Sequence, residues 1–96
     1  MEIVLNPELI EKESISNLHF PSEALEKTKD EHKILRMKLQ KAQTLGNIHH
    51  NKIKIWFKDD TELKEVRTTV WAVGTDNVVL KKGVFIPIHR IVDIQI

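Results

Sequence analysis

Three lysines and a tryptophan alternate along one short segment, as Lys52, Lys54, Trp56 and Lys58, and these residue types could bind a polyanion. In a β-strand, side chains two residues apart lie on the same face, so the four would share one surface. Ammonium groups can neutralise phosphates while an indole stacks on an unpaired base, which is how proteins bind single-stranded nucleic acid without reading its sequence. A hairpin partner strand would add Arg67 to this face. The sequence therefore predicts a candidate nucleic-acid site of these residues.

The same pattern has a structural explanation, in which a helix covers Trp56 while the lysine stems extend past it into water. The charge distribution does not decide between the two. Residues 1–30 carry seven acidic and three basic side chains, and residues 31–55 carry one acidic and six basic side chains. Residues 56–96 carry six of each kind, and the net charge of the chain is +1. Basic residues near the C-terminal end of a helix are also favoured by its dipole.

Metal binding would have to use His49, His50 and His89 with an acid such as Asp59 or Asp93. Adjacent histidines in an extended segment point to opposite sides, and no pair has the spacing of four that a helical zinc site uses. We expect solvated histidines and no metal.

Catalytic patterns are equally weak. The chain has no Cys, no nucleophile elbow and no glycine-rich phosphate loop, and Asp59 and Asp60 occupy a typical turn position. We expect neither an enzyme nor a cofactor.

Length and composition predict a single domain over residues 1–96, because 96 residues suffice for one core and not for two. The hydrophobic share of 41% and the charged share of 30% are those of an ordinary globular protein. The absence of Cys argues against a disulfide-stapled extracellular module. No basic leader and no apolar run of about 18 residues is present, so we expect a cytoplasmic protein that is not inserted in a membrane.

The first half of the chain predicts a leader over residues 1–21, with a short helix over 7–14, and then a long amphipathic helix over 22–45. Ser22 is placed to cap this helix, and Gly46 to end it. Its apolar face follows a helical spacing, through Leu25, His32, Leu35, Leu39 and Ala42.

Residues 52–96 predict five short antiparallel strands, because the apolar period changes from helical to alternating and turn residues separate the runs. The expected strands cover residues 52–58, 62–73, 78–80, 84–88 and 91–96. The fold class is therefore α+β, an N-terminal helix followed by a small Sm-like or SH3-like barrel, with an open meander as the alternative.

Three runs carry a resemblance: Thr68-Thr69-Val70-Trp71-Ala72, Leu80-Lys81-Lys82-Gly83 and Ile86-Pro87-Ile88-His89-Arg90-Ile91. Together with the helix end at residues 39–47, they resemble short uncharacterised bacterial proteins that share these strands. The resemblance leaves the first 30 residues unmatched and implies no activity, cofactor or site residue.

Two functions remain open. The first is a non-catalytic binding or structural module that acts by protein interaction or self-association, since the terminal residues 91–96 and the weakly apolar start of the helix offer surfaces for pairing. The alternative is single-stranded RNA or DNA binding through Lys52, Lys54, Trp56, Lys58 and Arg67. Burial of Trp56 beneath the helix would remove the central residue of the second hypothesis.

Overall fold

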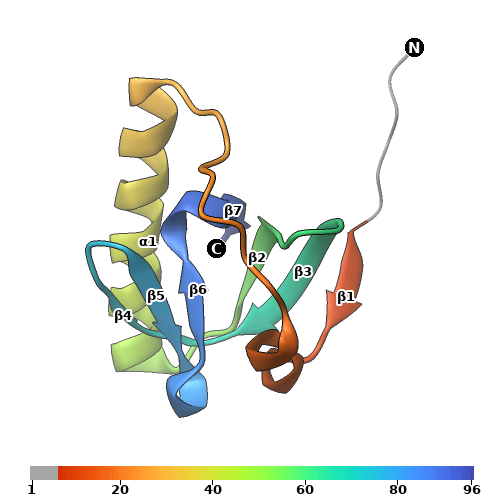
Figure 1. Cartoon of the computed structure of the whole chain (residues 1–96). Helices are drawn as coiled ribbons and strands as arrows, with labels where there is room; N and C mark the ends of the chain where they lie inside the picture. Colours follow the sequence, from red (N-terminus) through yellow and green to blue (C-terminus); the bar gives the residue numbers. More distant parts are fainter. Residues whose placement is uncertain (1–6) are drawn as a thin grey trace.

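The computed structural model describes residues 7–96, in which one long helix and seven strands surround a single core (Figure 1). The strands form two sheets, with orders β1-β3-β2-β7 and β4-β5-β6. The α+β class is confirmed. The elements in chain order are β1 (Glu8–Ile10), the 3-10 helix η1 (Lys12–Asn17), α1 (Lys29–His49), β2 (Ile53–Lys58), β3 (Leu63–Thr68), β4 (Val70–Val73), β5 (Asn77–Leu80), η2 (Lys81–Gly83), β6 (Phe85–Pro87), η3 (Ile88–Arg90) and β7 (Ile91–Gln95).

The second predicted strand, over 62–73, is divided at Thr69, and this division overturns the closed barrel. Thr68, Thr69 and Val70 are all buried, so three consecutive side chains are enclosed where the chain passes between the sheets. The chain leaves one sheet after Thr68 and joins the other at Val70, and the strands form two sheets instead of a closed barrel or a single meander.

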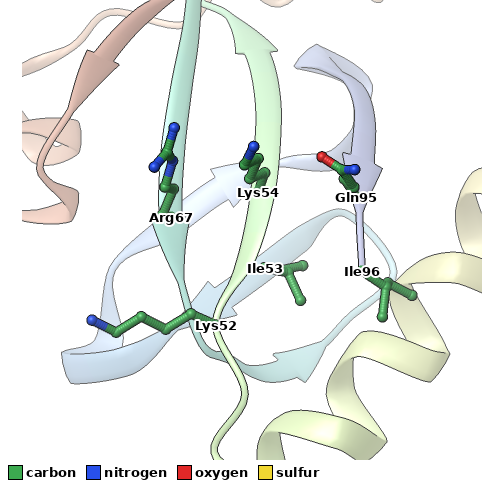
Figure 2. A pocket seen from close by; sticks show the side chains of 6 residues that line it. All are labelled: Lys52, Ile53, Lys54, Arg67, Gln95 and Ile96. Atoms are coloured by element: carbon green, nitrogen blue, oxygen red, sulfur yellow. The ribbon is translucent and has the colours of Figure 1, made fainter.

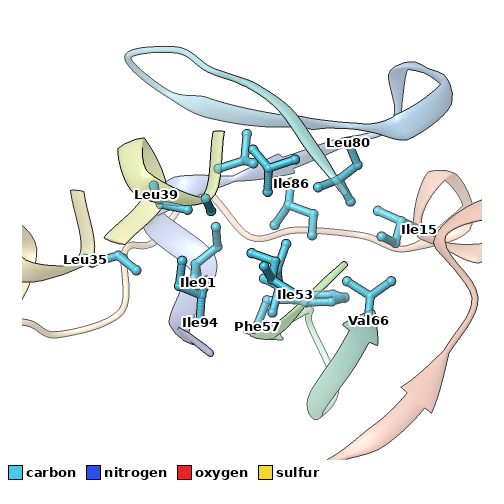
Figure 3. Close-up of a cluster of buried hydrophobic side chains, with 14 residues drawn as sticks. Ile15, Leu35, Leu39, Ile53, Phe57, Val66, Leu80, Ile86, Ile91 and Ile94 are labelled. Atoms are coloured by element: carbon cyan, nitrogen blue, oxygen red, sulfur yellow. The ribbon is translucent and has the colours of Figure 1, made fainter. Parts of the chain in front are cut away.

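The core lies between the two sheets and α1, as Figure 3 shows for its buried apolar side chains. Alternate residues of β2 and β3 face alternate residues of β5 and β6, as their spacing of two requires. Burial of each large side chain contributes about 1.5–3 kcal/mol. The buried set is Ile15, Leu35, Leu39, Ala42, Ile53, Ile55, Phe57, Val66, Val70, Val78, Leu80, Ile86, Ile91 and Ile94.

The segment before α1 is not a helix and the predicted start at Ser22 is wrong. The helix begins at Lys29, with Thr28 as its N-cap: the Thr28 hydroxyl accepts from the amide of Glu31, whose carboxylate accepts from the amide of Thr28. This capping box satisfies amides that the helix leaves unpaired. Residues 22–28 carry no helix because tertiary hydrogen bonds hold their backbone.

Arg90 makes several of those bonds. Its buried guanidinium donates to the carbonyl oxygens of Glu23, Lys58 and Asp59, at 2.7, 3.0 and 3.1 Å. The Leu25 amide donates to the carbonyl oxygen of the neighbouring His89 at 3.0 Å. In Figure 1 the held segment is the orange stretch between η1 and α1, and these bonds fix it beside the start of β7.

A second buried charge stabilises the turn between β2 and β3. The Lys64 ammonium lies 2.6 Å from the Asp59 carboxylate, which also accepts from the amides of Thr61 and Glu62. Burial alone would raise the pKa of Asp59, but these hydrogen bonds outweigh it and hold that pKa well below its ordinary value. The turn role predicted for Asp59 is confirmed.

The N-terminal part differs from the predicted helix over 7–14. Asn6, which precedes that helix and has the residue type of an N-cap, lies outside the described residues, and the chain forms the strand β1 and then η1. β1 pairs in parallel with β3, with Leu9 opposite Glu65, and so supplies hydrogen-bond partners to the free edge of that strand. The helix α1 is therefore not the first element.

The end of α1 depends on Gly46, although not as a stop signal. The helix continues to His49 and closes at His50, whose φ of 55° is left-handed. Gly46 lies inside the helix against β4, where a Cβ atom would stand 2.2 Å from the carbonyl oxygen of Val70. Only glycine allows this approach, which holds the C-terminal end of α1 against β4.

We predict that Gly46→Ala lowers the free energy of unfolding by about 1–3 kcal/mol, because the new methyl group forces the backbones apart. The loss outweighs the gain of about 1 kcal/mol that alanine brings inside a helix. Urea unfolding followed by circular dichroism measures the difference. Gly74→Ala is the control, since its Cβ would meet the nearest atom at an ordinary 3.4 Å. Equal stability of the two variants would contradict the prediction.

Candidate nucleic-acid interface

The candidate residues lie on the outer face of the β1-β3-β2-β7 sheet. Ile53, Ile55 and Phe57 of β2 are buried, so the residues that alternate with them, Lys54 and Trp56, point away from the core. Across the sheet Lys54 stands opposite Arg67 of β3 on one side and Gln95 of β7 on the other. Figure 2 shows these three side chains next to one another on neighbouring strands.

A depression of about 310 Å³ lies at this end of the sheet, lined by Lys52, Lys54, Arg67, Gln95 and Ile96 and by the edge of Ile53. Cations directly opposite each other on a sheet repel. Within residues 7–96, neither Lys52 nor Lys54 forms an ion pair, and Arg67 uses its Nε to bind Glu65 at 2.8 Å. An anion in the depression would offset this repulsion.

Trp56 lies one row further along the same face, where it is half-buried. Its Nε1 donates to the Glu65 carboxylate at 2.9 Å, and Asp93 of β7 is its cross-strand neighbour on the other side. The helix α1 packs mainly on β4 and β7. Two carboxylates therefore border the indole, Glu65 paired with Arg67 and Asp93 with Lys38 at 3.0 Å, and no unpaired cation of the described residues lies beside Trp56 in its cross-strand row.

Lys58 lies at the opposite end of β2. It borders a different depression, together with Glu26, Lys27 and Glu31, in which charges of both signs are mixed. Six residues of strand place it about 20 Å from Lys52. The structure thus gathers Lys52, Lys54 and Arg67 and leaves Trp56 and Lys58 outside the group.

Trp71 is the residue that the sequence interpretation missed. It is 46% exposed and belongs to the β4-β5-β6 sheet, not to the sheet that carries Arg67. It borders a second depression, of about 610 Å³, together with His50, Lys52 and Lys81. The alternating pattern gives the outward side for both Arg67 and Trp71, but it does not reveal that the chain changes sheets between them.

The histidines considered as metal ligands are separated. His49 and His50 lie at the end of α1, whereas the Nε2 of His89 is 2.9 Å from the carbonyl oxygen of Pro21. Over residues 7–96, the structure contains no group of three histidine or acidic side chains that could hold a metal ion.

The helices of the described part are also too short or too polar to cross a membrane.

The chain matches no protein-family model, no curated protein and no solved structure.

The contacts of Glu65 predict a pH response. Hydrogen bonds from Arg67 and then from Trp56 hold the pKa of Glu65 below its ordinary value of 4.5. A lowered pKa means that the carboxylate stabilises the fold above pH 4.5, and that this contribution disappears as the pH falls through the lowered pKa. In a Trp71→Phe variant, we expect the emission of Trp56 to change with a midpoint below pH 4.5.

Emission of the same variant carrying Glu65→Gln is the control and should not follow this titration. A midpoint at or above pH 4.5, or an unchanged titration in the control, would show that the carboxylate does not hold Trp56.

Proposed function

We propose that the chain is a cytoplasmic, non-catalytic binding module whose ligand is single-stranded nucleic acid. The observation that carries the proposal is the convergence of Lys52, Lys54 and Arg67 on one depression, with Glu65 as the only acid paired to any of them among residues 7–96. Three cations beside a single acid keep a net positive charge, which a phosphate backbone can neutralise.

The shape of the site favours a single strand over a duplex. The cations come from adjacent strands about 4.8 Å apart and surround a depression of about 310 Å³. A duplex is recognised by a helix or ribbon inserted into its major groove, which is about 12 Å wide, whereas the cations here lie on neighbouring strands of a sheet. A flexible strand can follow a short row of cations on a sheet.

We also propose kinship with Sm-like and SH3-like folds, which the sequence resembles in its strand pattern. Two features support it. One long β segment is divided between two sheets at Thr69, and the tight 3-10 turn η3 joins the last two strands, β6 and β7.

We predict that Lys54→Ala weakens binding of a labelled oligothymidine and lowers its salt dependence. Contacts to three phosphates give a slope of about −2 for the logarithm of the affinity against that of the salt concentration, and loss of one contact reduces its size by about 0.7. Fluorescence anisotropy at several salt concentrations measures both quantities.

Lys58→Ala is the matched control, because it removes the same charge from the same face of β2 outside the depression. It should bind as the unaltered protein does. Equal losses in the two variants would contradict a localised site, and no binding by the unaltered protein would reject the function.

Self-association is the second candidate function, and the outer face of the β4-β5-β6 sheet favours it. Phe85, which is 57% exposed, stands next to Val79, which in turn stands next to Ala72, so one uncharged row crosses three strands. Exposed aromatic and aliphatic side chains grouped in this way are typical of interaction surfaces.

For this candidate, light scattering should detect dimers that Phe85→Ser dissociates, since a polar residue would interrupt the row. A monomer at high concentration, or a dimer that this substitution leaves intact, would contradict self-association through this face.

A further inference from the structure

We propose that the bound strand continues past Lys52 into the second depression, where one of its bases stacks on the exposed indole of Trp71. The proposal rests on the function proposed above and extends it, since it assigns the stacking role to a residue outside the original candidate set. The depression holds about 610 Å³ and is lined by Trp71 together with Asn47, His50, Lys52, Thr69 and Lys81. Ligand sites of 300–1,000 Å³ are typical for small molecules, so one nucleotide fits.

The two depressions are adjacent because Lys52 borders both. A nucleic-acid strand whose phosphates contact Arg67 on β3 and Lys54 on β2 therefore reaches Lys52 next. Beyond Lys52 the lining changes from the cations of one sheet to the indole of the other. We expect a contacted length of about four nucleotides, which is the lower end for compact single-strand binders.

The conformation of β4 presents Trp71 to the ligand. The pairing of β4 with β5 shifts register between Val70 and Ala72, so Trp71 is the extra residue of a bulge and has no partner in the register. Bulges re-aim a side chain and are frequent beside functional sites. The indole is consequently 46% exposed, although Val70 before it is fully buried.

Thr69 fixes the cationic and polar walls of the depression relative to the indole. Its hydroxyl donates to the carbonyl oxygen of His50 at 3.3 Å, and its own carbonyl accepts from the amide of Lys81 at 3.1 Å. The backbones that carry the imidazole and the ammonium group are thus both tied to the residue two positions before Trp71. The site is held by three segments of the chain.

The charges around the second depression indicate where the base and the phosphates of the bound nucleic acid lie. The C-terminal end of α1, which carries a partial negative charge, borders this depression through Asn47 and His50. That charge disfavours a phosphate and favours the N–H groups of a base, such as the N3–H of thymine. The base therefore belongs beside the helix end, and the phosphates belong on Lys52, Lys54 and Arg67.

Trp56 does not compete for the stacking role. Its indole N–H is bonded to Glu65, and Asp93 stands on its other side, whereas Lys52 and Lys81 border Trp71 and form no ion pair within residues 7–96. We therefore expect the same oligonucleotide to quench the fluorescence of Trp71 and to leave that of Trp56 unchanged.

Two single-tryptophan variants, Trp56→Phe and Trp71→Phe, separate the two rings by intrinsic fluorescence. Addition of an eight-residue oligothymidine should quench the emission of Trp56→Phe, which keeps Trp71, and leave that of Trp71→Phe unchanged. In anisotropy measurements, Trp71→Leu should bind this oligonucleotide about tenfold more weakly, as loss of one stacked base implies. Because the indole is exposed, both Trp71 variants should keep the unaltered melting temperature.

The outcomes distinguish the two proposals. If Lys54→Ala weakens binding and Trp71→Leu does not, the inference about Trp71 is overturned and the proposed function stands. If the unaltered protein binds no oligonucleotide, both the proposed function and the inference about Trp71 are rejected. A peptide of eight glutamates is the further control: quenching of Trp71 by the peptide as strong as that by the oligonucleotide would show an acidic-peptide site without base stacking.

Discussion

The close approach of α1 to β4 at Gly46 and Val70 is the contact on which the candidate surface depends. Because glycine has no Cβ, the helix lies against the backbone of the strand at the point where the chain changes sheets. The hydroxyl of Thr69 adds a bond to His50 at the same place. The end of α1, the start of β2 and the start of β4 are held together as a result, and with them His50, Lys52 and Trp71.

Charged side chains are divided between two roles. Asp59, Lys64 and Arg90 are buried, and each is satisfied by hydrogen bonds that fix a turn or the segment before α1. Burial of charges is costly unless such partners are present, so these groups serve the specificity of the fold. Lys52 and Lys54 are paired with no acid in the described residues, and their repulsion remains for a ligand to offset. This contrast separates the charges that hold the fold from those that we propose bind a ligand.

The sequence predicts the features that follow a regular spacing of residues, such as which side chains of a strand point outward. It does not predict the features that depend on tertiary contacts, such as where the helix begins and ends. The alternation in β2 correctly placed Lys54 and Trp56 outward, because one buried face fixes the register of a strand. Ser22 has the residue type of an N-cap, yet bonds from Arg90 to Glu23 and from Leu25 to His89 keep the backbone around it out of a helix. Gly46 has the residue type of a stop, yet it serves a helix–strand contact. The place of Trp71 on the second sheet, unpaired in a bulge, depends on tertiary contacts that no local pattern encodes.

We propose that one continuous surface, from Arg67 through Lys54 and Lys52 to Trp71, binds single-stranded nucleic acid. Amide and indole NMR spectra of the labelled protein, recorded during titration with oligothymidine, test this proposal. We expect shifts to concentrate at Lys52, Lys54 and Arg67 and at the indole N–H of Trp71, while the signals of Lys58 and Phe85 stay unchanged. Shifts confined to the row around Phe85, or an unperturbed spectrum at saturating oligonucleotide, would contradict it.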